Sequence, residues 1–410
     1  FQLTKAPIKQ IAARRNGPSH RVFTLLKRLS RNENHMRQIT FLLIVSVLIS
    51  CHSKNNDQGS HDTLYSVDTV LIDSKGQPLY LKYQLINSSI DKEKRSIFLF
   101  NDFNHSIDEV NLDELALVNN YPFETEGPDG TGEPVNNFNV LKDGRFFIKS
   151  FSKSGVFDRS GALIQKIDWI NSIDSTGIKY GEVPNIELLG EHTGLTVFGL
   201  NYDYKNREIG LDVLSVQKNV VKRFEIDAER SYRDFILTVE GTQYVLDPNV
   251  FLVVENNSII ISHQFSNEVL LFNSEGGFIK KVDYEPKLTP KRVNKGNEKG
   301  LADLKQVREE YKNYLGQVCF YPPVWDEVNK RYLRLSTKSV YSEKESKNSF
   351  LPEVQESKAY LSVFDVDFNL VSELPIPELT MKPTKYFAKD GKLWVFKNFS
   401  DELGFIIVNI

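Results

Sequence analysis

The stretch Ser258–Asn273, SIIISHQFSNEVLLFN, decides the fold because it aligns without a gap on Ser96–Asn111, SIFLFNDFNHSIDEVN. Each stretch contains an apolar run, a polar connection, a second strand-like run and a closing Asn. Short runs rich in Ile, Val, Leu and Phe are typical of β-strands. The pair therefore predicts a β-hairpin that is repeated along the chain, and internal repeats are the first guide to an architecture.

The ending of this hairpin recurs six times. In each copy apolar residues precede a short polar residue of the kind that starts a turn. The six endings are Val110-Asn111, Val156-Phe157-Asp158, Val213-Leu214-Ser215, Leu271-Phe272-Asn273, Val363-Phe364-Asp365 and Ile407-Val408-Asn409. After four of the endings, apolar residues return at the same offsets, which predicts a further strand after each turn.

Another hairpin precedes the repeated one. Lys-Asp-Gly-Arg separates Phe138–Leu141 from Phe146–Phe151, and Lys-Asp-Gly-Lys separates Tyr386–Ala388 from Leu393–Phe396. Asp-Gly between apolar runs favours a tight hairpin turn. Six units of four strands predict an all-β fold, a six-bladed β-propeller with four-stranded antiparallel blades. A two-sheet β-sandwich is the alternative, but it gives no reason for one register to repeat six times.

The last unit has only three strands of its own, because the chain given ends one residue after the sixth ending. Its third strand would leave the apolar edge Gly404–Val408 unpaired, and such an edge invites aggregation. Residues 63–73 are rich in β-forming residues and belong to no unit. We therefore expect 63–73 to be an N-terminal strand that closes the last blade beside 403–409.

The longest interval between endings contains an insertion. Apolar residues recur there at helical spacing, with Glu and Lys between them, at Leu301, Leu304, Val307, Tyr311 and Leu315. This pattern predicts an amphipathic helix over 300–315. We expect the insertion, at about 296–316, to pack on the propeller, and we expect its deletion to leave the propeller folded.

The N-terminal region has the plan of a secretory signal. From Met36 a short basic start leads to the apolar run Ile39–Ile49, which is too short to span a bilayer. The run and the following Ser50-Cys51 resemble a bacterial lipobox, which implies that 36–50 is removed and that Cys51 is lipidated. We expect 1–35 to be a mis-annotated upstream extension, 51–62 a lipidated tether and 63–410 the propeller.

Charge and missing motifs exclude several functions. Of 51 basic and 54 acidic residues, nine basic and one acidic lie in the first 50 positions, so the rest of the chain is acidic and a nucleic-acid partner is not expected. The chain lacks metalloprotease and nucleophile-elbow motifs and zinc-type cysteine pairs. We therefore predict no metal site and no cofactor. Cys319, in an apolar run, is expected to be a packed side chain rather than a reactive thiol.

The connections between strands fall into two sets. Those on one face are tight, whereas those on the opposite face, here called the long-loop face, are long: 122–136, 168–183, 201–208, 227–244, 284–317 and 338–357. Long ordered loops on a rigid scaffold commonly carry binding sites. The candidate ligand-binding residues there are Glu126, Asp129, Trp169, Tyr180, Tyr202, Tyr204, Arg230, Tyr232 and Arg233. Turn formation, packing and solvation are the competing explanations for these residues.

The lipobox, the loop Glu126–Gly132 and the helix before Cys319 resemble the DUF4221 family of six-bladed propeller lipoproteins from Bacteroidetes, over about 62–410. The resemblance implies the fold and an envelope location but no activity. We expect a lipid-anchored protein on the periplasmic side of the outer membrane that binds an unknown ligand or envelope protein through its long-loop face. The alternatives are a hydrolase or lyase acting on glycan, lactone or peptide with carboxylates at the channel mouth, and a structural subunit of an envelope complex.

Overall fold

A computed structural model describes residues 65–190, 195–203, 205–227, 230–242, 245–296, 301–344 and 349–410. Residues 63–410 form one unit by their contacts. The signal segment 36–50, the lipobox residue Cys51 and the tether 51–62 lie outside the described residues, so the expectations for them stay predictions. Among the described residues, no helix is long and apolar enough to cross a membrane.

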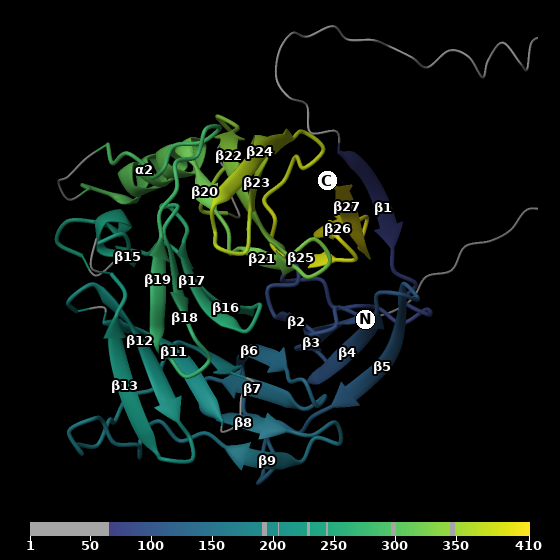
Figure 1. The fold of residues 1–410 in the computed structure, drawn as a ribbon, viewed down its shortest axis with the longest axis vertical. Helices are drawn as coiled ribbons and strands as arrows, with labels where there is room; N and C mark the ends of the chain where they lie inside the picture. Colours follow the sequence, from purple (N-terminus) through teal and green to yellow (C-terminus); the bar gives the residue numbers. More distant parts are fainter. Residues whose placement is uncertain are drawn as a thin grey trace, which may run out of the picture. The chain divides into compact units, whose positions relative to one another are not determined.

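Six antiparallel sheets surround a central axis as the blades of a propeller (Figure 1). Blades 1 to 3, from inner to outer strand, are β2 (Ser88–Ile90), β3 (Ser96–Asn101), β4 (Ser106–Asn111) and β5 (Ala116–Pro122); β6 (Val135–Val140), β7 (Phe146–Ser150), β8 (Ser154–Phe157) and β9 (Leu163–Lys166); and β10 (Ile186–Gly190), β11 (Thr196–Asp203), β12 (Glu208–Ser215) and β13 (Val220–Glu225).

Blades 4 to 6 continue this pattern around the ring. They are β16 (Val250–Glu255), β17 (Ser258–His263), β18 (Val269–Phe272) and β19 (Phe278–Val282); β20 (Cys319–Phe320) and β21 (Val324–Asp326), both pairing with β22 (Arg331–Tyr341), then β23 (Val354–Phe364) and β24 (Leu370–Ile376); and β25 (Tyr386–Lys389), β26 (Lys392–Phe399), β27 (Glu402–Asn409) and β1 (Ser66–Leu71). The predicted six-bladed, all-β fold is confirmed.

The six repeated endings lie at the ends of the third strands of the blades. The polar residue of the ending organises the turn that follows. The side-chain Oδ1 atoms of four of them, Asn111, Asp158, Asn273 and Asp365, each accept hydrogen bonds from two backbone N–H groups two to four residues later. These short polar side chains recur because they supply acceptors that the tight turn itself cannot provide.

The N-terminal strand closes the ring as predicted. β1 pairs antiparallel with β27, from Ser66 opposite Asn409 to Leu71 opposite Gly404. The chain then reaches the next blade, where Asp73 forms a parallel bridge with Ala116 at the start of β5. β1 therefore connects the last blade with the first by backbone hydrogen bonds.

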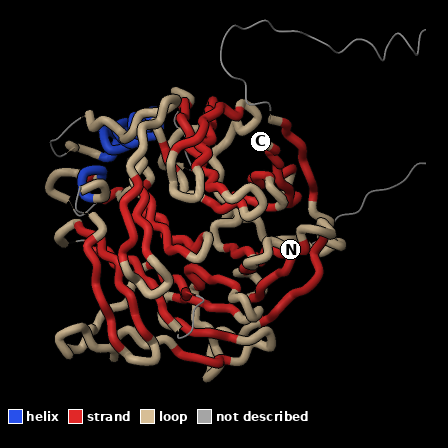
Figure 2. Tube along the Cα trace, in the orientation of Figure 1, coloured by secondary structure: helices blue, strands red, loops and turns tan. Residues whose placement is uncertain are grey.

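The insertion contains the predicted helix, α2 (Leu304–Gln317), which lies beside blade 5 on one side of the ring (Figure 2). The helix begins at Asp303, whose side chain accepts a hydrogen bond from the Gln306 backbone N–H. Val307, Tyr314 and Leu315 are fully buried in the largest hydrophobic cluster, together with residues of blades 5 and 6. The helix is therefore packed into the core, which argues against the expectation that deleting the insertion leaves the propeller folded. That expectation stays a prediction.

The two faces differ as expected, although two predicted loops are shorter. β11 ends at Asp203 and β12 begins at Glu208, so half of 201–208 is strand. The strands β22 and β23 take up 338–341 and 354–357, the two ends of the predicted loop 338–357. The link 226–249 contains the short helix η1 (Arg233–Phe235) and the hairpin β14 (Leu237–Thr238) and β15 (Val245–Leu246). The links before β6 and β10 remain long and irregular.

Candidate functional site

The link between blades 1 and 2, residues 123–134, holds the predicted glycine-rich loop. The loop folds back on itself, with Thr131 and Gly132 donating backbone hydrogen bonds to the carbonyls of Glu124 and Thr125. The Lys153 ammonium donates to the carbonyl oxygens of Gly127 and Gly130, at 3.1 and 2.9 Å. The loop therefore binds a cation through its carbonyls, which is the opposite of the cradle of amides that an anion would need.

The two acidic candidates in this loop differ in role. The Asp129 carboxylate accepts a 3.0 Å hydrogen bond from the backbone of Leu163, at the start of the outer strand of blade 2. Asp129 therefore fixes the loop to the neighbouring blade. Glu126 is exposed to solvent, and its side chain is available to a partner.

Carboxylates gather around His105, in the turn between β3 and β4. The imidazole Nε2 lies 2.7 Å from the Thr131 hydroxyl, and the ring packs against Phe100. Burial lowers the pKa of His105, while the nearby Glu133, Asp102 and Glu124 favour its charged form. The link and this turn thus form one acidic region on the long-loop face.

Two phenylalanines flank the acidic region, and neither is among the candidates predicted from the sequence. Phe103, at the tip of the β3–β4 turn, is 88% exposed, and Phe151, in the β7–β8 turn, is 79% exposed. The Phe151 backbone N–H donates to Pro134 of the link. We call Phe103, Phe151, Glu124, Glu126 and Glu133 the acidic–aromatic surface. The sequence does contain a signal for Phe103. A large aromatic residue at a turn tip, as in Asn-Asp-Phe-Asn, is unusual because most turn tips are polar.

The aromatic candidates Trp169 and Tyr180 belong to the link between blades 2 and 3 and serve packing. Trp169 is buried, and its Nε1 donates a 2.9 Å hydrogen bond to the buried carboxylate of Glu187. The link packs directly on β11, where a Cβ at Gly199 would lie 2.3 Å from Pro184. Trp169 offers no ring face to a sugar or peptide.

Tyr180 belongs to a charged network that fixes the same link. Its hydroxyl donates to Asp212, which accepts two more hydrogen bonds from Arg223, at 2.7 and 3.0 Å. Arg223 also contacts Glu182 of the link, at 2.7 Å. Burial raises the pKa of Tyr180, and its hydrogen bond to Asp212 raises it further. The network joins the link to blade 3, which is a structural role.

The remaining candidates lie on blade 3 and the link after it. Tyr202 packs edge-on against Tyr232, and Tyr232 is buried. Arg230 and Arg233, in the link between blades 3 and 4, are exposed. Tyr204 lies outside the described residues. The structure therefore brings Trp169 close to Tyr180 and Tyr202 close to Tyr232, and these four described residues form two separate pairs rather than one aromatic platform.

The central channel is narrowed on the tight-turn face by two opposite blades. Lys94, in the β2–β3 turn of blade 1, lies 3.5 Å from Glu255 of blade 4, and Lys92 donates to the side chain of Asn257 at 3.2 Å. Glu255 also accepts a hydrogen bond from the Trp325 backbone. Within the described ranges, no group of three or more His, Cys, Asp or Glu is placed to hold a metal ion.

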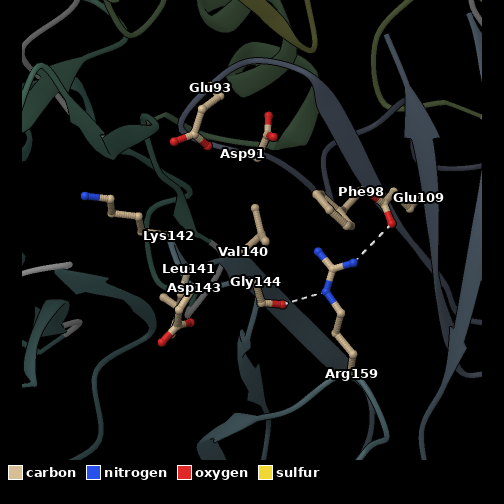
Figure 3. A pocket seen from close by; sticks show the side chains of 10 residues that line it. All are labelled: Asp91, Glu93, Phe98, Glu109, Val140, Leu141, Lys142, Asp143, Gly144 and Arg159. Carbon is tan, nitrogen blue, oxygen red and sulfur yellow. Dashed lines mark hydrogen bonds and ion pairs between the residues drawn. The ribbon is translucent and has the colours of Figure 1, made fainter. Parts of the chain in front are cut away.

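A small cavity of about 290 Å³ opens between blades 1 and 2 on the tight-turn face (Figure 3). It is bordered by the β2–β3, β6–β7 and β8–β9 turns. Its wall includes the buried Glu109, which accepts hydrogen bonds from Ser96, Asn119 and Tyr121 and lies 3.4 Å from Arg159. Burial alone would raise the pKa of Glu109, but these donors outweigh it and hold the pKa below its usual range.

The geometry defines the class of protein: a six-bladed propeller closed by its N-terminal strand, with one tight-turn face and one long-loop face. Residues 60–375 match the family model of DUF4221, a domain of unknown function, and the chain belongs to this family.

Two solved structures similar to this chain come from Bacteroides. A DUF4221 member from Bacteroides vulgatus is 12% identical, with a TM-score of 0.57 over 84% of this chain and 98% of that chain. A Bacteroides fragilis protein described as exported is 11% identical, with a TM-score of 0.48 over 86% of this chain and 97% of that chain. No curated protein matches the chain. At these identities the first likeness supports the fold alone.

Proposed function

We propose that this protein is a lipid-anchored binding protein of the cell envelope whose acidic–aromatic surface docks a basic segment of a protein partner. The observation that carries the proposal is the exposure of Phe103 and Phe151 on either side of an acidic link. Aromatic side chains contribute most of the binding energy at many interfaces. Carboxylates around them favour a partner with Lys or Arg.

The lipobox supports the anchoring. Cys51 would carry the acyl chains, and several chains together give stable membrane attachment. The described chain enters the propeller at β1, and Ser66 lies opposite Asn409, at the tight-turn end of the third strand of blade 6. This entry point supports an orientation in which the long-loop face is directed away from the membrane, on the periplasmic side of the outer membrane.

Cross-linking in native membranes tests the docking surface. We expect a Phe103→Ser/Phe151→Ser double variant to lose the cross-linked partner. A matched control, Val328→Ser/Val366→Ser, removes two exposed apolar residues from turns on the opposite face and should retain the partner. A contact segment rich in Lys and Arg supports the proposal. A partner held equally by both variants, or through an acidic segment, overturns it.

Fractionation of the same native membranes tests the lipid anchor. The change Cys51→Ala removes the acyl acceptor, so we expect the variant to leave the membrane fraction after a high-salt wash. The wild-type protein should remain in that fraction. A variant that still sediments with membranes would show that the lipobox interpretation is wrong.

A further inference from the structure

The cavity between blades 1 and 2 is lined by charges of both signs: Arg159 and Lys142, and the carboxylates Asp91, Glu93, Glu109 and Asp143. Figure 3 shows the guanidinium of Arg159, from the β8–β9 turn, on the opposite side of the cavity from the carboxylates of Asp91 and Glu93, from the β2–β3 turn. The apolar side chains of Val140 and Leu141 also line the cavity. A cavity with a cation at one end, carboxylates at the other and an apolar wall selects for the shape and the dipole of a ligand.

The guanidinium of Arg159 is held in place by hydrogen bonds that do not use all of its N–H groups. Its Nε donates to the Gly144 carbonyl at 3.1 Å, and one terminal nitrogen contacts Glu109 and the Tyr121 hydroxyl. The group also lies over the Tyr121 ring. The other terminal nitrogen has no hydrogen-bond partner in the described part of the chain and lies 3.2 Å from where a Cβ at Gly144 would be. Gly144 therefore leaves that edge of Arg159 accessible.

At the opposite end the cavity is lined by Asp91 and Glu93, and the charge of Arg95 favours the ionised form of Asp91. The Asp91 carboxylate uses one oxygen, Oδ1, to accept hydrogen bonds from the backbones of Arg95 and Ser96. Burial raises the pKa of Asp91, and the charge of Glu93 adds to that rise. A ligand ammonium placed here would relieve the repulsion between the two carboxylates.

We propose that this cavity binds a free α-amino acid. The ligand carboxylate would pair with the accessible edge of Arg159, and the ligand ammonium would lie between Asp91 and Glu93. The cavity volume suits a molecule of this size, since it is at the small end of ligand sites. A simple anion would be repelled by the carboxylates, and a simple cation would leave the accessible edge of Arg159 unpaired, whereas a dipolar ligand pairs with both ends.

Calorimetric titration of the purified propeller with the standard α-amino acids tests the site. We expect saturable binding of at least one amino acid. The matching acid without its ammonium and the matching amine without its carboxylate should each bind at least about tenfold more weakly, since each leaves one end of the cavity unpaired. Absence of saturable binding for every amino acid overturns the proposal.

Variants test which residues bind the ligand ammonium and which bind the ligand carboxylate. Glu93→Gln is on the exposed rim, and Asp91→Asn keeps the oxygen that organises the turn, so both should fold. Both should weaken binding of the amino acid and leave the deaminated acid unchanged, whereas Arg159→Lys should weaken both ligands. Lys166→Gln, an exposed change in β9 outside the cavity lining, is the matched control and should bind as wild type. Equal affinity in wild type, Asp91→Asn and Glu93→Gln overturns the proposal.

Discussion

Buried polar side chains between blades 4 and 5 show how a single residue sets the response to pH. The guanidinium of Arg334 is 1% exposed, and it donates to the carbonyl oxygens of Tyr321, Asn267 and His263 and to the Tyr284 hydroxyl. Neither ring nitrogen of the nearby His263 has a hydrogen-bond partner among the described residues. A positive charge on this imidazole would be both desolvated and repelled by Arg334.

His263 is therefore predicted to make the protein sensitive to acid. Burial, with the charges of Arg334 and Arg292, lowers the pKa of His263 from 6.5 to about 3. The unfolded chain binds this proton more tightly, so stability is complete above pH 6.5 and falls as the pH drops towards 3. The loss is about 2 kcal/mol by pH 5, from 1.36 kcal/mol per unit of pKa.

Denaturant unfolding of wild type and His263→Phe, at neutral pH and near pH 5, measures this contribution. The Phe variant keeps an aromatic ring against Phe235 and cannot be protonated. Its free energy of unfolding should therefore fall less between the two pH values than that of wild type. An equally steep fall in the variant would assign the acid sensitivity to other groups.

At the scale of single residues, the sequence identifies side chains that could bind a ligand, but it does not show whether they are buried or exposed. Trp169 and Tyr232 lie in loops and each is next to a charged residue, Asp168 and Arg233, yet both are buried, because the links fold back on the blades. Phe103 lies two residues after the strand β3 and is almost fully exposed. Burial in a link depends on contacts with distant strands, such as Pro184 on Gly199, and no local pattern contains that information.

The helix α2 illustrates the limits at the scale of an element. Its periodicity predicts its existence and places its start within a few residues. Periodicity also identifies an apolar face, but it does not reveal how much of that face the propeller covers. Only the packing against β22, β14 and β20 shows that α2 completes the largest hydrophobic cluster, which it shares with blades 5 and 6.

We predict that removing a buried side chain from α2 destabilises the whole propeller. Leu315→Ala should lower the free energy of unfolding by about 2 to 5 kcal/mol, because the side chain is fully buried. Lys305→Ala, on the exposed side of the same helix, should change it by less than about 0.5 kcal/mol. Chemical denaturation of both variants provides the comparison, and similar values for the two would place α2 outside the cooperative core.

For the whole molecule, the sequence was informative because the fold repeats. Four of the six strand endings share one physical cause, an acceptor at the start of a tight turn, so each of these copies supports the others. Ring closure could be predicted because the last unit leaves an apolar strand edge unpaired, and residues 63–73 form a β-rich segment that belongs to no unit. The acidic–aromatic surface and the cavity follow no repeat, and they appear only when neighbouring blades are placed side by side.

The ring closure leads to a prediction for the whole molecule. A chain that starts at residue 74 lacks β1, so the β27 edge over Gly404–Val408 becomes unpaired. It also loses Ile72, which is buried beside blades 1 and 6. We expect a loss of at least about 3 kcal/mol in the free energy of unfolding, from this side chain and the strand ladder together. We also expect concentration-dependent association through the free edge.

Thermal unfolding and light scattering of three chains make this test specific. A chain that starts at residue 63 keeps β1 and lacks the tether, so it should melt as the chain that starts at residue 52 does. The chain that starts at residue 74 should melt at a lower temperature and associate. A synthetic peptide of residues 63–73 should reverse both effects, because an added strand can restore the backbone pairing. If the chain that starts at residue 74 melts at the same temperature as the other two, the pairing of β1 with β27 is only local and does not stabilise the ring.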